Sequence, residues 1–150
     1  MSTNHTVSQV MVIDDDPFDQ ALIRSAFQRV GSAAHVHTVP DVGVAIGLLE
    51  SREPPSLLIV DFKLGAESGL ELIEWVRHQD QLATLPAIVL SGSDDPIDAR
   101  AAHLAGANAY VVKPPDLEGL ETVVRSINTF WFQTCALSTS LLANGSIGST

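Results

Sequence analysis

Three charged sites in this chain each follow directly after a short apolar run. The sites and the runs before them are Asp14, Asp15 and Asp16 after 10–13, Asp61 after 57–60, and Lys113 after 109–112. A fourth apolar run, residues 86–90, ends at the hydroxyl of Ser91. If the fold brings these ends together, it gathers carboxylates, one amine and one hydroxyl. Such a set suits a divalent cation together with a phosphoryl group.

The apolar runs are separated by helix-length segments, a pattern typical of buried parallel strands. We expect strands near 10–13, 35–39, 57–60, 86–91 and 107–112. We expect a helix after each strand, over 17–30, 41–49, 69–79, 95–105 and 116–131. This alternation predicts an α/β fold with a doubly wound parallel sheet. Ligands bind outside the carboxyl ends of the strands in such a sheet, so the polar ends should meet at one edge.

Capping residues support these boundaries. Asp16 is expected to cap the first helix, with Pro17 in its first turn and Gly31 at its end. The inward face of this helix is predicted to carry Phe18, Leu22, Ile23, Ala26, Phe27 and Val30. The apolar face of 95–105 is thin, since Ile97 and Leu104 are its only large apolar residues. Residues 62–68 are expected to form a loop.

The composition limits the classes of function. A chain of 150 residues with 45% hydrophobic content suits one domain with a proper core. The net charge of −10 argues against binding to nucleic acid, which requires clusters of lysine and arginine. Residues 1–9 do not resemble a secretory signal, no apolar stretch is long enough for a membrane span, and Cys135 is the only cysteine. These features predict a soluble cytoplasmic protein without nucleic-acid or membrane partners.

The charged residues also have simpler explanations. Asp16 fits a helix cap, and Asp14 and Asp15 alone fit a turn about as well as a site. Asp61 at the end of a second strand favours a metal site, because crowded carboxylates repel one another unless a cation compensates. The alternative for Lys113 is an ordinary surface lysine. Ser91 alone is a weak signal, since serine is common in turns and helix caps.

Together, these motifs resemble the receiver domain of two-component response regulators. The matching stretches are VIDDDP at 12–17, LIVD at 58–61, IVLSG at 88–92 and GANAYVVKP at 106–114. The resemblance covers roughly residues 10–132. It implies a five-stranded, flavodoxin-like parallel sheet with strand order 2-1-3-4-5 and helices on both faces.

The resemblance also implies which residues carry the chemistry. Asp61 would be the phosphoacceptor, attacking a phosphohistidine of a sensor histidine kinase. Asp14, Asp15, Asp61 and the backbone carbonyl of Lys63 would hold Mg²⁺. The reaction would be an in-line phosphoryl transfer, in which positioning and charge neutralisation do most of the catalysis.

Further roles follow from the same resemblance. Ser91 would be the switch hydroxyl that moves to the phosphoryl group, and Tyr110 the aromatic residue that turns inward with it. Lys113 would contact a phosphoryl oxygen, and its bond to Pro114 is often cis in receivers. Ser93 is a candidate for tuning the lifetime of the phosphoryl group.

The chain departs from the family pattern at four positions. Gly65 stands where proline is usual, so the loop is expected to be more mobile. Ser91 replaces the more frequent threonine and lacks its β-branch. We hypothesise that Lys63 tunes the lifetime of the phosphoryl group, or that its side chain reaches across the loop to Glu67. Pro115 stands where a bulky residue is more usual, and nothing in the sequence explains it.

The aromatic run Phe130, Trp131 and Phe132 closes the last helix. Successive helical residues point about 100° apart, so at least one ring should be exposed or covered by the tail or another protein. The alternative is that the helix has ended and the rings fold under it. The segment 130–137 resembles the C-terminal ends of single-domain regulators paired with bacteriophytochrome-type kinases. Some of these dimerise through the last helix and tail, so the three rings are interface candidates.

We therefore expect a stand-alone receiver that signals by protein contact or onward phosphotransfer. Its parts would be a disordered lead over 1–8, a receiver over 9–134 and a tail over 135–150, with no output domain. It would catalyse only its own phosphorylation and dephosphorylation. One alternative is a dimeric adaptor that works without phosphorylation. Another is an aspartyl-phosphate phosphohydrolase of the haloacid dehalogenase type, which needs a second aspartate where Lys63 stands.

Overall fold

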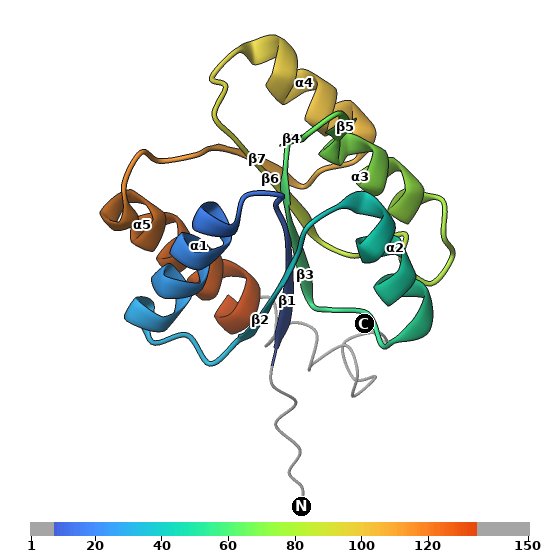
Figure 1. Ribbon diagram of the computed structural model, residues 1–150. Helices are drawn as coiled ribbons and strands as arrows, with labels where there is room; N and C mark the ends of the chain where they lie inside the picture. The colour runs from blue at the N-terminus through green and yellow to red at the C-terminus, as the bar shows by residue number, and fades with distance from the viewer. Residues whose placement is uncertain (1–7, 135–150) are drawn as a thin grey trace, which may run out of the picture.

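A five-stranded parallel sheet forms the centre of the computed structural model, which describes residues 8–134 (Figure 1). The sheet order is β2-β1-β3-β6-β7, and all its pairings are parallel. The strands are β1 (Gln9–Ile13), β2 (His35–Val39), β3 (Leu57–Asp61), β6 (Ala87–Ser91) and β7 (Ala109–Val112). When only the five strands of this sheet are numbered in chain order, so that β6 and β7 become strands 4 and 5, the sheet order is 2-1-3-4-5. The predicted fold class is confirmed.

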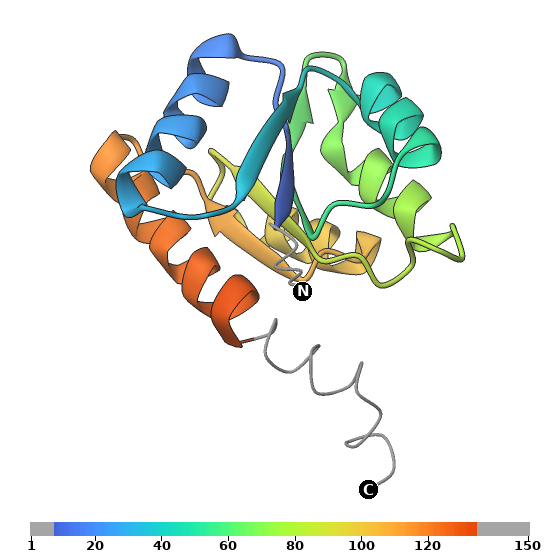
Figure 2. The same cartoon turned by 90° about the horizontal axis from the view of Figure 1, so that it is seen from below.

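Helices cover both faces of the sheet (Figures 1 and 2). The helices are α1 (Pro17–Val30), α2 (Val42–Ser51), α3 (Gly69–Arg77), α4 (Pro96–Ala105) and α5 (Leu117–Ile127). Alternate strand residues point to opposite faces, which gives the sheet two cores. One core packs against α1 and α5 and the other against α2, α3 and α4. No helix within residues 8–134 is both long and apolar enough to cross a membrane.

Side-chain caps fix where the helices begin. The N-cap side chains of Asp16, Asp41, Ser68, Asp95 and Asp116 each accept a hydrogen bond from a backbone N–H in the first turn. This bond satisfies one of the amides that a helix start leaves free. Asp16 therefore has the capping role that the sequence predicts, and Gly31 ends α1 in the left-handed conformation.

The segment 62–68 is a small hairpin rather than an irregular loop. Strands β4 (Lys63–Leu64) and β5 (Glu67–Ser68) pair antiparallel, with Lys63 opposite Ser68 and Leu64 opposite Glu67. Gly65 has φ +62° in the two-residue turn between them. Glycine at the first turn position with positive φ is typical of a type II′ hairpin, and proline cannot adopt that angle. This explains a glycine where the family usually has proline.

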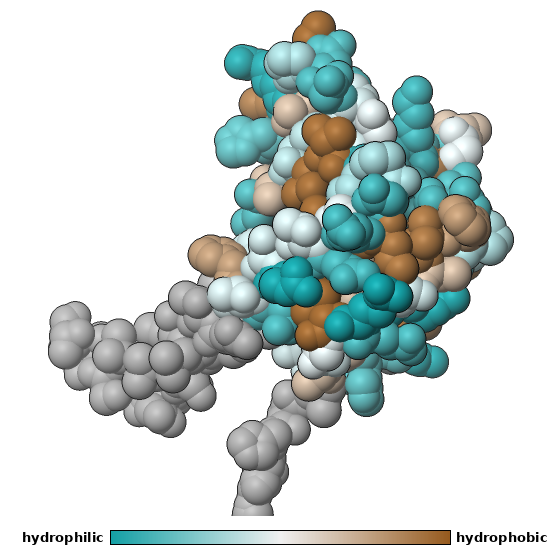
Figure 3. Space-filling model, turned by 90° about the vertical axis from the view of Figure 1, so that its left-hand side faces the viewer, coloured by the Kyte–Doolittle hydropathy of each residue, from teal (hydrophilic) through white to brown (hydrophobic). Residues whose placement is uncertain are grey.

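Three apolar side chains that the sequence placed on helix faces lie in solvent. Phe18 is 68% exposed, and Ile97 and Leu104 are each 73% exposed. Phe18 stands in the first turn of α1, before the helix buries Ile23 against the sheet. Helix α4 instead buries the small residues Ala102 and Ala105. The prediction of an inward face was therefore wrong for Phe18, and the large residues of α4 are not its buried face. On the side of the molecule that carries α1 and α5, hydrophilic and hydrophobic side chains are interspersed (Figure 3).

The last helix continues from α5 into a π-helical segment, η1 (Asn128–Thr134). Phe130 is 53% exposed, whereas Trp131 packs against the core beneath α1 and α5. The two rings meet edge to face with centroids 4.8 Å apart. The prediction that at least one ring is exposed is confirmed by Phe130. The side chain of Phe132 and the expected tail over 135–150 lie outside the described residues, as does most of the expected lead.

Candidate functional site

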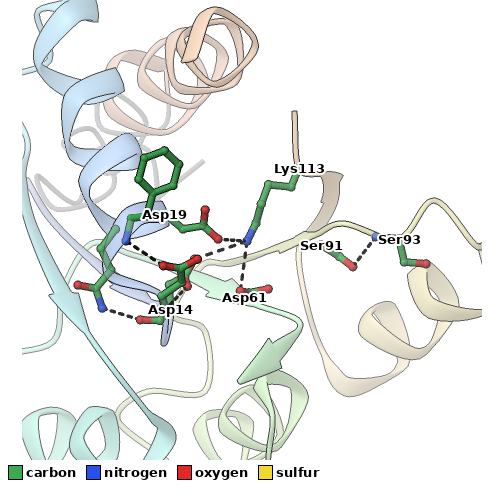
Figure 4. Close-up of polar contacts among 9 residues, drawn as sticks. Asp14, Asp19, Asp61, Ser91, Ser93 and Lys113 are labelled. Atoms are coloured by element: carbon green, nitrogen blue, oxygen red, sulfur yellow. Dashed lines mark hydrogen bonds and ion pairs between the residues drawn. The ribbon is translucent and has the colours of Figure 1, made fainter. Parts of the chain in front are cut away.

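The predicted site residues come from four neighbouring strands of the sheet. Asp14 follows β1, Asp61 ends β3, Ser91 ends β6, and Lys113 follows β7. Because these strands are parallel, their carboxyl ends lie at one edge, and the side chains of Asp14, Asp61 and Lys113 point toward one another (Figure 4).

The Lys113 ammonium is the centre of this arrangement. Its Nζ atom lies 3.1 Å from Oδ2 of Asp19, 3.2 Å from Oδ2 of Asp61 and 3.5 Å from Oδ2 of Asp14 (Figure 4). Burial alone lowers the pKa of Lys113, but the charges of Asp61 and Asp14 and the bonds to Asp19 and Asp61 outweigh it, so the pKa is raised. The amine is therefore a fixed positive charge at neutral pH.

Asp14 is buried and Asp61 is partly buried, and both carboxylates hold their protons more tightly than usual. Burial raises the pKa of Asp14 to about 6, although the Asp16 N–H and Lys113 act against this. The Asp16 N–H donates to Asp14 Oδ1 at 2.9 Å. Burial also raises the pKa of Asp61, against the opposing effects of Lys113 and the Lys63 N–H. Both carboxylates lack full compensation for their desolvation, as expected at a site built for an additional cation.

Asp19 is a member of the site that the sequence did not single out. It lies in the first turn of α1, where an acidic residue is favoured by the helix N-terminus in any protein. Because an acidic residue at this position is common, the sequence pattern did not indicate that Asp19 belongs to the site. Only the direction of α1 relative to β7 brings its carboxylate to Lys113.

The carboxylates fit the donor set of a hard divalent cation. Oxygen atoms of Asp14, Asp19 and Asp61 all lie within 4.8 Å of one another. Mg²⁺ prefers such oxygens and keeps several waters. Asp15, predicted as a ligand, is exposed and stands outside this group of three, beside the turn at Gly65.

The segment after β6 links the predicted switch residues. Ser91 is buried, and its Oγ accepts a hydrogen bond from the Ser93 N–H at 3.1 Å. The Ser93 hydroxyl donates to Asp98 of α4 at 2.6 Å. The Tyr110 hydroxyl donates to the Ser93 carbonyl at 2.7 Å, and its ring meets Phe62 edge to face. Ser91 is therefore engaged with its own loop, and not with Asp61.

Two expectations about backbone and side chains differ from the structure. The bond between Lys113 and Pro114 is trans, although cis is frequent in the family. The Lys113 N–H donates to the Ser91 carbonyl at 2.6 Å. Within residues 8–134, no ion pair joins Lys63 to Glu67; the backbone ladder places Lys63 opposite Ser68 instead.

Fold and site together define the class of the protein. A five-stranded parallel sheet carries an aspartate cluster and a lysine at the carboxyl ends of its strands. The family model described as the response regulator receiver domain matches residues 10–125. The chain belongs to this family, which comprises signalling proteins of two-component systems rather than classical enzymes.

Several relatives cover most of the chain. An uncharacterized 14.6 kDa protein of Leptolyngbya boryana is 39% identical over 71% of this chain and 79% of its own. Response regulator Rcp1 of Synechocystis is 24% identical over 85% of this chain and 91% of its own. Rcp1 in its Mn²⁺-bound form superimposes with a TM-score of 0.75 at 22% identity, covering 85% of this chain and 96% of that chain. The phosphorylated cyanobacterial phytochrome response regulator RcpA has a TM-score of 0.79 at 25% identity, covering 86% and 96%.

Proposed function

We propose that this protein is a phosphoacceptor of a two-component phosphorelay, with Asp61 as the residue that receives the phosphoryl group. The observation that carries the proposal is the contact of 3.2 Å between Asp61 and the partly buried Lys113 ammonium. It places a nucleophilic oxygen and a positive charge at one point. The related RcpA has been described as a phosphorylated response regulator, which supports the same reaction for this chain.

The residues divide the work of phosphoryl transfer. A carboxylate oxygen of Asp61 attacks the phosphorus of a phosphohistidine, the P–N bond breaks, and the departing imidazole takes up a proton. Lys113 donates to one of the oxygens of the transferred group. Positioning of this kind, with charge neutralisation, supplies most of the catalysis in phosphoryl transfer.

Mg²⁺ is the cofactor that the carboxylates suit. Asp14 and Asp61 would hold it, and Asp15 together with the Lys63 carbonyl remain ligands implied by family resemblance. When bound, Mg²⁺ neutralises charge on the phosphoryl oxygens. The related Rcp1 has been described in an Mn²⁺-bound form, which supports a divalent cation here.

Ser91 and Tyr110 are the proposed switch. For Ser91 to reach the phosphoryl group, its hydroxyl must leave the Ser93 N–H, so the segment after β6 must move. Tyr110 is bonded to the Ser93 carbonyl and would follow this movement. Lys63 and Ser93 flank the site and remain candidates for tuning the phosphoryl lifetime.

A sensor histidine kinase is the proposed donor of the phosphoryl group. RcpA is described as a phytochrome response regulator, which favours a bacteriophytochrome as this kinase.

The exposed ring of Phe130 supports a homodimer through the last helix and tail, with Trp131 and Phe132 as further candidates for the interface. We propose a cytoplasmic protein that signals by protein contact or onward transfer.

A phosphate-affinity gel tests the proposal. Wild type and Asp61→Asn are treated with acetyl phosphate, with and without Mg²⁺. A retarded band that requires both Asp61 and Mg²⁺ is the expected result. A folded wild type with no retarded band would contradict it and favour an adaptor independent of phosphorylation. Turnover of small phosphate esters would favour a phosphohydrolase, which Lys63 at the second-aspartate position argues against.

A further inference from the structure

The Lys113 ammonium has a partner beyond the residues that family resemblance implies. Its Nζ atom donates to Asp19 Oδ2 at 3.1 Å and to Asp61 Oδ2 at 3.2 Å. We propose that Asp19 is a positioning residue of the phosphoacceptor site, which holds the Lys113 ammonium beside Asp61, ready for the phosphoryl group. This inference rests on the phosphoacceptor function proposed above.

The carboxylate of Asp19 is presented by a firmly placed element. Asp16 caps the start of α1 by accepting from the Phe18 N–H at 2.9 Å. Further along, Arg29 of α1 pairs with Glu121 of α5 at 2.6 Å, and Ser32, just after α1, donates to Asn128 of η1 at 3.0 Å. Asp19 is therefore anchored at a helix start, whereas Lys113 carries its charge on a flexible four-carbon stem.

The geometry explains what Asp19 adds to Asp14 and Asp61. Asp61 changes its chemistry when it is phosphorylated, and Asp14 lies further from the ammonium, at 3.5 Å. Asp19 keeps its carboxylate through the transfer and makes the shortest of the three contacts with Lys113, at 3.1 Å. Since an ammonium has three N–H donors, Lys113 can keep Asp19 while it donates to a phosphoryl oxygen.

A purely local role for Asp19 would be to stabilise the N-terminus of α1 through the helix dipole. That role predicts a small loss of stability in Asp19→Asn and no change in the behaviour of Lys113. The positioning role predicts a change at Lys113 itself. Glu118 provides a matched control, because it is an exposed acidic residue in the first turn of α5.

NMR of the lysine ammonium groups tests the proposal without any phosphoryl chemistry. The chain has two lysines, Lys63 and Lys113, so exposed Lys63 serves as an internal reference. In wild type, the Lys113 ammonium signal is expected to be protected from exchange with water. In Asp19→Asn it should broaden or disappear, with Lys63 unchanged, and Glu118→Gln should match wild type. An unchanged Lys113 signal in Asp19→Asn would overturn the inference.

A kinetic measurement provides the second readout. At saturating Mg²⁺, phosphorylation by acetyl phosphate should be about three- to fivefold slower in Asp19→Asn than in wild type or Glu118→Gln, the range of a partly exposed ion pair. Asp19→Glu, which keeps the charge, should recover part of the rate and replaces Asp19→Asn if that variant does not fold. Equal rates in wild type and Asp19→Asn overturn the inference alone. A wild type that is not phosphorylated overturns the proposed function. In that case the NMR measurement still tests whether Asp19 holds the Lys113 ammonium.

Discussion

Lys113 and Asp61 meet at 3.2 Å although their strands are not neighbours in the sheet. Asp61 ends β3, Lys113 follows β7, and β6 lies between these strands. The Lys113 backbone is tied to β6 by its N–H bond to the Ser91 carbonyl. Its long side chain then crosses β6 to reach Asp61, a distance that a shorter side chain could not span. Lys113 thus links β7 to β6 through its backbone N–H and to β3 through its ammonium group.

Neutralising Asp14 should stabilise the protein in the absence of divalent cations. The folded pKa of Asp14 is raised from its ordinary 3.8 to about 6, so the native state binds more protons than the unfolded state between these values. Stability attributable to Asp14 therefore falls as pH rises through that window and stays low above it. Asp14→Asn should raise the free energy of unfolding by about 1–3 kcal/mol at pH 8.

Denaturant unfolding at several pH values, with a chelator present, checks this prediction. The advantage of Asp14→Asn should shrink toward zero near pH 4, where Asp14 is protonated in wild type as well. Adding Mg²⁺ should stabilise wild type more than Asp14→Asn, because a bound cation stabilises only the state that binds it. An advantage that is independent of pH would show that the charge of Asp14 is not its cause.

The close contact of α3 with β3 should make Gly69 intolerant of substitution. A methyl group at Gly69 would overlap the Asp61 carbonyl oxygen and come within 2.6 Å of Val60 Cγ1. Gly69→Ala should therefore cost about 1–3 kcal/mol of unfolding free energy and displace the backbone of Asp61. Gly47→Ala in α2 is the control, since nothing lies within 4 Å of the added methyl group, and it should be neutral or slightly stabilising. Thermal melting that ranks the two variants in the opposite order would contradict this account.

Arg77 should contribute to stability through the loops it joins. Its guanidinium donates to the carbonyls of Gly106, Ala83 and Leu85 and to Asn108 Oδ1, at 2.9, 3.1, 2.7 and 3.0 Å. Arg77→Ala removes this donor from the three carbonyls, while Asn108 Oδ1 still accepts from the Ala87 N–H, and the change should cost about 2 kcal/mol or more. Arg100→Ala, at an exposed position of α4, should change the unfolding midpoint little. Equal effects of the two substitutions would contradict the assigned contacts.

Replacing Gly65 by the proline that is usual in the family should disrupt the hairpin of this chain. Gly65 has φ +62°, and proline is locked near −65°, so Gly65→Pro should break the turn between β4 and β5. Gly65→Asn should be better tolerated, because asparagine adopts positive φ more readily than most residues. Amide hydrogen exchange of Leu64 and Glu67 measures hairpin pairing in both variants. Retained protection in Gly65→Pro would show that the turn does not depend on glycine.

The sequence pattern predicted the strands, the helix caps and the convergence of Asp14, Asp61 and Lys113. These features depend on local signals, namely apolar runs, capping side chains and the rule that parallel strands end at one edge. Asp19 could not be predicted in this way, because its part in the site depends on where α1 lies relative to β7. Its only local signal, an acid near a helix start, is common to many helices.

Other differences have equally specific reasons. Ile97 and Leu104 were the only large apolar residues of α4, and periodicity could not reveal that Ala102 and Ala105 form its buried face. The hairpin at 62–68 is too short to give a strand pattern. The continuation of α5 as a π-helix likewise has no recognised sequence signal. Of these features, the buried face of α4 is decided by packing against elements that are distant in sequence.

Mapping the phosphorylated residue tests the central claim most directly. The carboxylates of four residues, Asp14, Asp15, Asp19 and Asp61, lie at or beside the site. We propose that Asp61 alone receives the phosphoryl group. After treatment with acetyl phosphate and Mg²⁺, the acyl phosphate is reduced with borohydride and located by peptide mass spectrometry. We predict modification at Asp61 and none in Asp61→Asn. Modification of another carboxylate, or a folded wild type that stays unmodified, would contradict it.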